Sequence, residues 1–350
     1  MLHFIRTLLL LSICSTLLPA QTPAPSAPVS APQASKTAGS DPEFTEARRL
    51  SQQGKYDEAI SQLQARTTRT PKPAGLSHEL GAAYYKKGDY LKAADFLKQA
   101  VAEDPNDKEA VQLLGLSYYV SGRPAEAIPY LEKVQTWYPR ANVDAAYVLG
   151  ICYLQSRDYP QARKAFAKMF DVPPDSGASY LLTARMLFRQ EFIPIAEEYA
   201  QKAIVTDPKL PLAHQLLGEI HMFTSKIPEA ISDFEQELAI NPGYPAAYYK
   251  LGDAYSRIQK YDEAERLLQR SIWLDATSTG PYILMGKVLE KKGEPILAIR
   301  ALQRAVSMDP NNNITHHLLG QAYRDIGKTD EAEKELKLAE QLQGKPEASQ

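Results

Sequence analysis

The side chains that could do chemistry in this chain are few and far apart. His214 and His221 are seven residues apart, so a helix would place both imidazoles on one face, where their nitrogens could bind a metal ion. His316 and His317 are adjacent and would point to two different faces of a helix. The spacing leaves two interpretations of the first pair, a metal site or packing in the interior.

The remaining reactive groups also lack partners at a useful spacing. The sequence contains two cysteines, Cys14 and Cys152, and no phosphate-binding, dinucleotide-binding, zinc-protease, C-x-x-C or nucleophile-elbow motif. Asn313 begins an Asn-Ile-Thr tripeptide, which is a glycosylation acceptor in a eukaryotic secretory pathway, but this asparagine is also suited to cap a helix. We therefore predict no enzyme activity, no metal site and no cofactor.

Residues 1–20, MLHFIRTLLLLSICSTLLPA, have the pattern of a secretory signal peptide. Arg6 precedes an apolar run from Leu8 to about Leu18, shorter than the roughly 20 residues of a membrane-spanning helix. We expect cleavage near Ala20, export to the periplasm or the medium, and no membrane span after cleavage. A lipoprotein anchor at Cys14 is disfavoured, because an isoleucine precedes it where a small residue is usual.

Two further segments are expected to lie outside the folded body. Residues 21–39 are rich in Pro, Ala and Ser with almost nothing to bury, which predicts a disordered linker, and residues 347–350 form a short tail. If the signal is removed, Cys152 is the one cysteine left, so an intramolecular disulfide is excluded. Stability must then come from packing.

Composition excludes some classes of partner. The 350 residues are 44% hydrophobic and 23% charged, as in an ordinary globular protein. The 40 basic and 42 acidic residues are scattered along the chain, and the net charge is -2. Without a stripe of positive charge, nucleic acid and anionic lipid are not expected as partners.

An internal repeat of 34 residues organises the rest of the chain. An alanine recurs in nine segments at intervals of 34 residues, with one interval of 35. When this alanine is numbered position 20, position 8 is glycine or alanine in every segment and position 32 is proline in seven. The nine alanines are Ala59, Ala93, Ala127, Ala162, Ala196, Ala230, Ala264, Ala298 and Ala332.

Leucine or methionine at position 7 and tyrosine at position 11 complete the pattern in most segments, as in Leu114 with Tyr118. The pattern resembles the tetratricopeptide repeat family, whose motif is W-x2-L-G-x2-Y, A-x3-F, P with the same period. The resemblance covers residues 40–346 and implies an all-α fold, an α-solenoid of nine antiparallel helix pairs stacked into a right-handed superhelix. The repeats are expected at 40–73, 74–107, 108–141, 143–176, 177–210, 211–244, 245–278, 279–312 and 313–346.

The same positions explain where each helix should begin and end. Glycine at position 15 in five repeats suits the left-handed turn after the first helix, and proline at position 17 or 18 suits the first turn of the second. Proline at position 32 then stops that second helix. His214 and His221 fall at interior positions 4 and 11, so packing is favoured over metal binding.

The resemblance also implies which side chains face a partner. In such proteins the inner surface comes mainly from the first helix of each repeat, at positions 2, 5, 9, 12 and 13. The expected apolar groove in repeats two to six comprises Tyr85, Leu116, Tyr119, Val120, Tyr147, Ile151, Leu154, Leu181, Phe188, Met222 and Phe223. The last three repeats instead present charges of both signs, namely Asp253, Arg257, Lys287, Glu290, Lys291, Arg324 and Asp325.

Adjacent tyrosines are expected to have different roles. Tyr118, at position 11, should pack between the helices of its own repeat, whereas Tyr119, at position 12, should face the groove. The other pairs with one core and one groove member are Tyr84 with Tyr85 and Tyr248 with Tyr249.

Two functions fit these observations. The first is an exported, non-catalytic scaffold for protein–protein interaction that binds a peptide or partner protein in the apolar groove. The alternative is a structural subunit of a cell-envelope assembly or export machine, for the outer membrane, a pilus or a polysaccharide, tethered near the membrane. Position 9 contains no asparagine in any repeat, so the carboxylate clamp of one family subset is not expected.

Overall fold

The computed structural model describes residues 42–138 and 143–343. Within these ranges the chain forms eighteen α-helices, the short 3-10 helix η1 (Pro42–Phe44) and no strand, which confirms the all-α class. The expected signal peptide, linker and tail lie outside the described residues. The α-helices are α2 (Thr45–Gln52), α3 (Tyr56–Gln64), α4 (Leu76–Lys87), α5 (Tyr90–Glu103), α6 (Lys108–Val120), α7 (Pro124–Trp137), α8 (Val143–Gln155), α9 (Tyr159–Phe170), α10 (Gly177–Arg189), α11 (Ile193–Thr206), α12 (Ala213–Phe223), α13 (Ile227–Ile240), α14 (Pro245–Arg257), α15 (Tyr261–Leu274), α16 (Thr279–Lys291), α17 (Pro295–Met308), α18 (Asn313–Asp325) and α19 (Thr329–Gln343).

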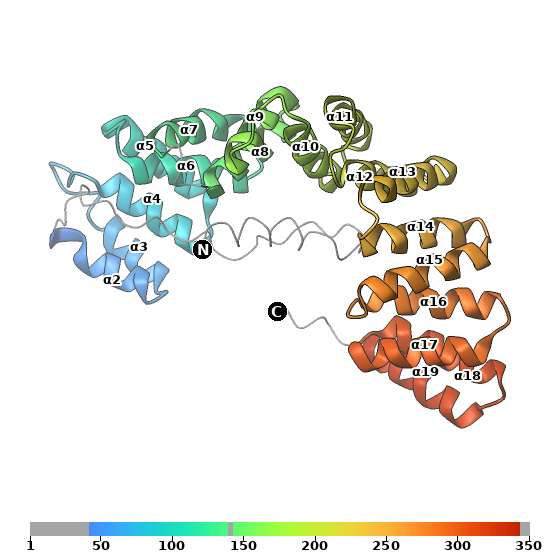
Figure 1. The fold of residues 1–350 in the computed structure, drawn as a ribbon. Helices are drawn as coiled ribbons and strands as arrows, with labels where there is room; N and C mark the ends of the chain where they lie inside the picture. The colour runs from blue at the N-terminus through green and yellow to red at the C-terminus, as the bar shows by residue number, and fades with distance from the viewer. Residues whose placement is uncertain (1–41, 139–142, 344–350) are drawn as a thin grey trace.

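The α-helices pack as nine consecutive pairs along an arc from α2 to α19 (Figure 1). We name the first member of each pair helix A and the second helix B. Helices A of most neighbouring pairs contact one another, whereas helices B of neighbouring pairs stay farther apart. The array therefore curves with helices A on its inner side, as expected for a solenoid of stacked pairs.

Small residues at positions 8 and 20 allow the two helices of a pair to come close. A Cβ atom added at Gly150 would lie 2.4 Å from Cε1 of Phe166, and one added at Gly81 would lie 2.5 Å from Cγ of Leu97. Real side chains do not approach so closely, so these positions have no space for a methyl group. All nine alanines at position 20 are buried, which confirms the repeat register.

The turn between helix A and helix B uses a left-handed backbone in all nine repeats. Position 15 is glycine in five of them, with φ between 75° and 88°. In the other four it is Arg157, Glu191, Ser225 or Gln259, with φ of 61° or 62°. A side chain in this conformation costs roughly 1–2 kcal/mol, because Cβ crowds the following carbonyl oxygen. The stacked pairs therefore impose this turn even where the sequence offers no glycine.

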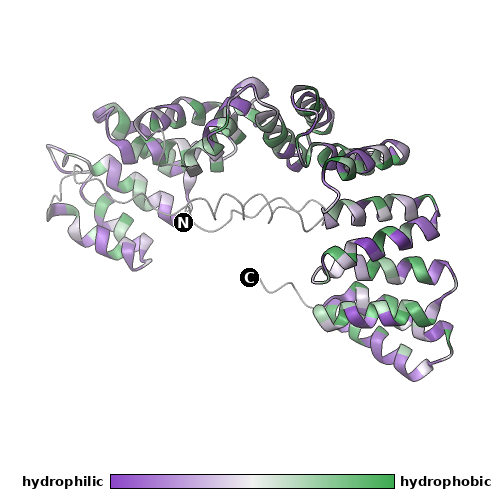
Figure 2. Cartoon of the chain, in the orientation of Figure 1, coloured by the Kyte–Doolittle hydropathy of each residue, from purple (hydrophilic) through white to green (hydrophobic). Residues whose placement is uncertain are grey.

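The apolar core runs through the array. One continuous cluster of buried side chains extends from Phe44 in η1 to Ile220 in α12, and smaller clusters follow in the remaining repeats. Each helix carries both polar and apolar residues, as Figure 2 shows, so its apolar side can pack in the core while its polar side faces solvent. The packing of buried apolar side chains holds the described repeats together without a disulfide bond. Cys152, the one cysteine within the described ranges, is free and buried.

Most helix boundaries follow the expected residues, with one correction. Proline opens or directly follows the start of five helices B, including α7 and α17. The cap of α18 is Asn312 and not Asn313: the Asn312 side chain accepts a hydrogen bond from the Thr315 amide at 3.0 Å. Asn313 was the wrong choice because the residue three positions before the bonded amide acts as the cap, one residue outside the helix.

Candidate functional site

The aromatic side chains expected in the groove line the inner side of helices A. Tyr85, Tyr119, Tyr147 and Phe188 are half-buried and pack against the main core, as is Leu181. Two of the expected residues are more open. Val120 is 40% exposed and Phe223 is 54% exposed. These seven side chains form the apolar strip, a name we keep for Tyr85, Tyr119, Val120, Tyr147, Leu181, Phe188 and Phe223.

Four expected groove residues are buried instead. Leu116, Ile151, Leu154 and Met222 are at most 9% exposed, so they belong to the core and a ligand could not reach them in this structure. Helices α6, α8 and α12, which carry these side chains, each pack against helices of neighbouring repeats as well as against their own helix B. The expectation that these four are open to a ligand is therefore wrong, while a binding role for the strip stays a prediction.

The tyrosine pairs divide as expected in the second and third repeats. Tyr118 is buried and lies 5.8 Å from the ring of Tyr130 on the helix B of its own repeat, whereas Tyr119 is half-buried. Tyr84 is likewise buried, and its ring stacks on Phe96 of α5 at 5.5 Å. The second tyrosine of each pair is thus left for the inner side of the array.

The third pair divides less clearly. Tyr248 and Tyr249 are both half-buried. The Tyr248 hydroxyl donates a hydrogen bond to the Pro242 carbonyl at 3.2 Å, so this residue is not enclosed in the core. The expectation of one core member fails here because the ring of Tyr248 lies beside the exposed Arg270 of α15, with the guanidinium 5.9 Å from its centroid.

Phe188 and Phe223 form an aromatic pair within the apolar strip. Their ring centroids are 5.7 Å apart and the ring planes are perpendicular, an edge-to-face geometry that aromatic pairs favour. They come from α10 and α12, the helices A of neighbouring repeats, which contact each other. Within this pair Phe223 is more than half exposed, whereas Phe188 is half-buried against the core.

Burial raises the pKa of two phenol groups of the strip above the usual value of about 10. It raises the pKa of Tyr119, and the nearby Tyr147 and Cys152 raise that pKa further. Burial and then Tyr90 do the same to the pKa of Tyr85. The hydroxyls therefore remain hydrogen-bond donors near neutral pH, suited to the carbonyl groups of a bound chain.

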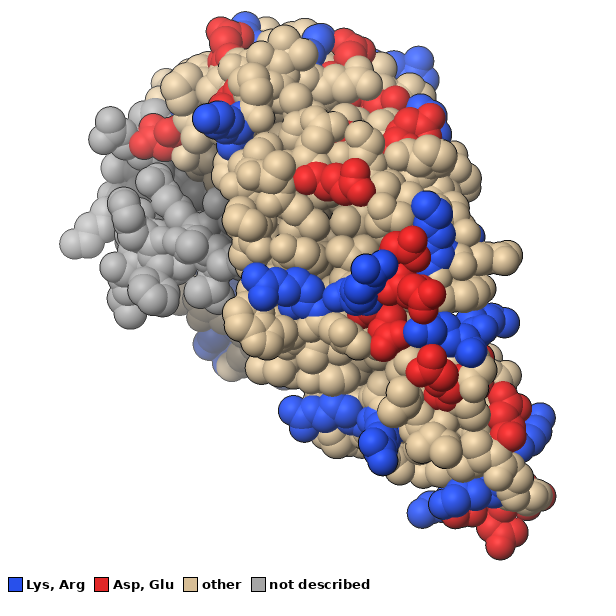
Figure 3. All heavy atoms as spheres, turned by 45° about the vertical axis from the view of Figure 1, so that its right-hand side comes forward, with Lys and Arg blue, Asp and Glu red and all other residues tan. Residues whose placement is uncertain are grey.

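Helices A of the last repeats carry charge. Arg257 pairs with Asp253 one helical turn earlier at 3.2 Å. Burial raises the pKa of Glu290 to about 7, and a hydrogen bond and charge repulsion from Asp325 add to this while Lys291 opposes it. On the face shown in Figure 3, basic and acidic side chains lie next to one another without a large area of one sign. A strong single-sign field is therefore absent from this face.

The histidines with metal-ligand spacing pack inside the array. His214 and His221 are both buried, and His221 Nδ1 lies 2.6 Å from Oδ2 of Asp233. Its Nε2 lies 3.3 Å from Oε1 of Glu197. Interior packing of the pair is confirmed, and within the described ranges no cluster of His, Cys, Asp or Glu is arranged to hold a metal ion.

Comparison with known proteins identifies the family. Two sequence models, each described as a tetratricopeptide repeat, match the chain over residues 44–108 and 283–347 and over residues 120–186 and 224–272. Together these segments cover well over half of the sequence.

The chain belongs to the tetratricopeptide repeat family.

Repeat solenoids of this family present extended binding surfaces, and at that level the protein is an interaction scaffold.

Individual relatives are distant or partial. A TPR repeat-containing protein of Methanocaldococcus jannaschii is 28% identical over 120 residues, which is 34% of this chain and 21% of the relative's length. Among solved structures, MamA is 26% identical, with 46% of this chain and 94% of MamA covered and a TM-score of 0.44. YrrB, described as a TPR protein with an unusual peptide-binding site, is 21% identical, with coverage of 52% and 93% and a TM-score of 0.45. The family assignment rests on the sequence models.

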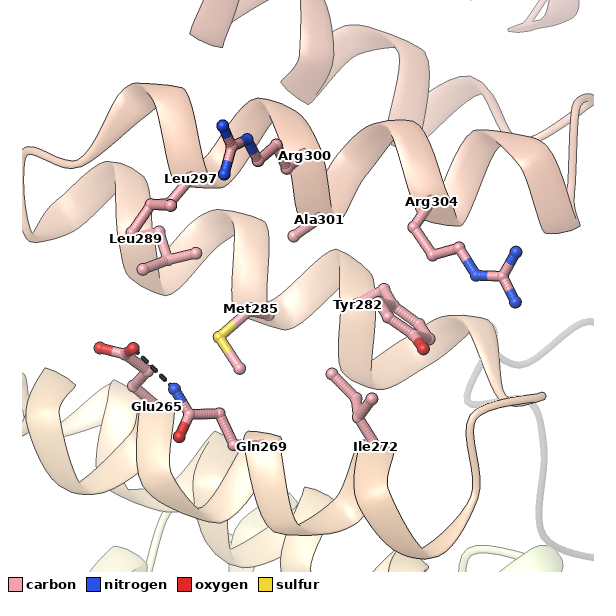
Figure 4. Close-up of a pocket in the computed structure, with 10 residues that line it drawn as sticks. All are labelled: Glu265, Gln269, Ile272, Tyr282, Met285, Leu289, Leu297, Arg300, Ala301 and Arg304. Atoms are coloured by element: carbon pink, nitrogen blue, oxygen red, sulfur yellow. Dashed lines mark hydrogen bonds between the residues drawn. The ribbon is translucent and has the colours of Figure 1, made fainter.

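A pocket outside the apolar strip was not foreseen. It has a volume of about 330 Å³ and lies between α15 and α17, with residues of α16 between them (Figure 4). Its apolar lining comprises Ile272, Tyr282, Met285, Leu289, Leu297 and Ala301. The α16 residues occupy positions 4, 7 and 11, which the motif assigns to packing. The one sequence feature that could have indicated this site is the composition of α17, PILAIRALQRAVSM, which contains two arginines and no acidic residue.

Proposed function

We propose that the protein is a non-catalytic scaffold that captures a peptide or partner protein on the apolar strip. The observation that carries this proposal is the edge-to-face pair of Phe188 and Phe223, in which Phe223 is 54% exposed. Exposed aromatic rings held rigidly in a concave surface supply much of the binding energy in protein interfaces. Tyr119 and Tyr147, which are half-buried on α6 and α8, belong to the same strip.

Replacing Phe223 by alanine is expected to weaken partner binding about 30-fold. The estimate corresponds to about 2 kcal/mol, the loss typical of a central aromatic residue at an interface. The partner is first captured with a photoreactive benzoylphenylalanine at position 223, and its affinity for the native chain and for Phe223→Ala is then measured by calorimetry. The side chain is more than half exposed, so the far-UV circular dichroism and melting temperature should barely change.

Val205 provides the matched control. It is an apolar residue 81% exposed on α11, a helix B, and therefore lies off the apolar strip. A photoreactive residue at position 205 should not capture the same partner, and Val205→Ala should leave its affinity unchanged. Equal capture from both positions, or unaltered affinity in Phe223→Ala, would exclude the strip as the binding surface.

We also infer that the protein acts after export, in the periplasm or outside the cell. The support is the signal-like sequence of residues 1–20. None of the described helices is long and apolar enough to cross a bilayer. Mass spectrometry of the protein from fractionated cells should find a mature N-terminus near residue 21 in the exported fraction. An intact N-terminal methionine in the cytoplasmic fraction would contradict export.

A further inference from the structure

The pocket between α15 and α17 exists because the array is curved. Helices A lie close together on the inner side, so helices B separate on the outer side and leave a gap floored by a helix A. In this gap Met285 and Leu289 of α16 are buried, while Leu297 of α17 is 44% exposed. Figure 4 shows α16 between the pocket residues of α15 and those of α17. A volume of about 330 Å³ is at the small end for a ligand site and suits one large side chain.

Two arginines at this pocket have no acidic partner. Arg300 and Arg304 line it from α17 and are both exposed. Among the residues that the structure describes, neither guanidinium forms a salt bridge or a hydrogen bond. Several other arginines of the chain are paired, such as Arg123 with Glu126 at 2.5 Å. The α17 edge of the pocket therefore carries two uncompensated positive charges.

The acidic residue on the opposite side does not neutralise these arginines. Glu265 of α15 pairs through Oε2 with the ammonium group of Lys292 at 2.5 Å. Its Oε1 accepts a hydrogen bond from Gln269 at 2.9 Å, drawn in Figure 4. The carboxylate is thus already paired with Lys292 and Gln269. The net charge of the side chains that line the pocket is therefore positive.

We propose that this pocket is a second docking site, for an extended peptide segment with one large apolar side chain and two carboxylates separated by one residue. Arg300 and Arg304 are four residues apart on a helix, which corresponds to a rise of about 6 Å. In an extended peptide, side chains two residues apart lie on the same side and about 6.7 Å apart. The two arginine side chains extend in opposite directions along α17 in Figure 4, and both are exposed, so each guanidinium can turn to meet one of two carboxylates at that spacing while the apolar side chain enters the pocket.

This site goes beyond the proposed function because it lies on a different face. No pocket residue occupies positions 2, 5, 9, 12 or 13, which form the inner side of the array. The outer-face pocket and the apolar strip could therefore hold different partners, or two segments of one partner. Linking two such sites raises the overall affinity without any new contact.

The test uses a fluorescein-labelled peptide that contains Phe-Ala-Asp-Ala-Asp, in which the phenylalanine and both aspartates lie on one side of the extended chain, and measures its fluorescence anisotropy with the full chain. The Arg300→Ala/Arg304→Ala variant is expected to weaken binding about tenfold, with a smaller loss at high salt because exposed charges are screened. The Arg300→Glu/Arg304→Glu variant should instead prefer a peptide in which lysines replace both aspartates. Both residues are exposed, so the variants should fold normally.

Arg266→Ala/Arg270→Ala is the control, since it removes two exposed arginines of α15 that do not line the pocket. It and Phe223→Ala should both leave peptide binding within about twofold of the native value. The proposal is overturned if the native chain does not bind the peptide, or if Arg300→Ala/Arg304→Ala binds it equally well. It is also overturned if either control weakens binding as much, or if sedimentation shows that the α17 arginines hold a second copy of the chain.

Discussion

Replacing Gly150 by valine is expected to lower the free energy of unfolding by about 3 kcal/mol, the upper end for overpacking a tight core. A Cβ atom at this position would lie 2.4 Å from Cε1 and 2.7 Å from Cζ of Phe166, and that ring is fully buried. The ring cannot move away without displacing its own neighbours, because protein interiors contain few voids. The two helices of the fourth repeat must therefore separate.

The loss can be measured by urea unfolding followed by far-UV circular dichroism. Hydrogen exchange should rise first in α8 and α9, because each repeat of a solenoid is stabilised mainly by its neighbours. Removing the ring should make room, so Phe166→Ala should cost less in the Gly150→Val background than in the native chain. Simple additivity of the two changes would show that the predicted clash does not occur.

Gly243 provides the matched control for this prediction. It lies between α13 and α14, and a Cβ atom added there would meet nothing within 4 Å. Gly243→Ala should therefore change stability by less than about 0.5 kcal/mol, as surface substitutions usually do. Equal losses at positions 150 and 243 would show that backbone freedom, and not the close approach of the two helices, determines the effect.

The repeat register could be predicted because small residues mark the contact between helices A and B. The spacing of the alanines at position 20 placed every helix pair, and all nine alanines are buried. The turns could be predicted only in part. Glu191 and Gln259 adopt the left-handed conformation that glycine adopts in other repeats. At those positions the packing of the whole array determines the backbone, which the local sequence does not reveal.

Helix ends show the same distinction. Helix α15 ends at Leu274, two residues before Ala276, although five other helices B end two residues before a proline. Helix α15 therefore ends at the expected place without a proline to stop it. Ser271 of α15 donates a hydrogen bond to the Pro245 carbonyl at the start of α14, a contact within the repeat that ties the two helix ends together.

The motif predicted which residues of helices A would face the inner side, but it did not predict which of them are exposed to solvent. The motif placed Ile151 and Leu154 on the inner side of α8, yet both are buried. A motif describes one repeat, whereas burial at positions 9 and 12 also depends on how the helices of the neighbouring repeats pack against it. The outer pocket was missed for a related reason, since Met285 occupies an ordinary packing position and only the separation of helices B opens a space beside it.

Replacing Glu237 by alanine is the second large effect expected, a loss of about 3 kcal/mol. Its side chain, from α13, is completely buried and accepts hydrogen bonds from the amides of Leu212 at 2.9 Å and Gln215 at 3.3 Å. Those amides lie at the N-terminus of α12, where the helix dipole favours an anion. Without the carboxylate both donors stay buried without an acceptor, at about 1–3 kcal/mol each.

A local measurement separates this role from general packing. The amides of Leu212 and Gln215 should exchange slowly in the native chain and rapidly in Glu237→Ala. Glu237→Gln should lose only about 1 kcal/mol, because its amide oxygen can still accept one of the two bonds. The control Glu235→Ala changes an exposed residue of the same helix that accepts one hydrogen bond from Tyr255, and should cost about 1 kcal/mol or less.

The reason that Glu237 matters lies in the backbone of the junction between the fifth and sixth repeats. Leu212 adopts a left-handed conformation with φ of 69°, where the equivalent residue of the second repeat is Gly75. A leucine tolerates this conformation only when other contacts hold it, and the Glu237 carboxylate holds its amide directly. Since α12 carries Phe223, loosening its first turn in Glu237→Ala should also weaken binding at the apolar strip. Unchanged binding together with rapid amide exchange would mean that the strip does not depend on this junction.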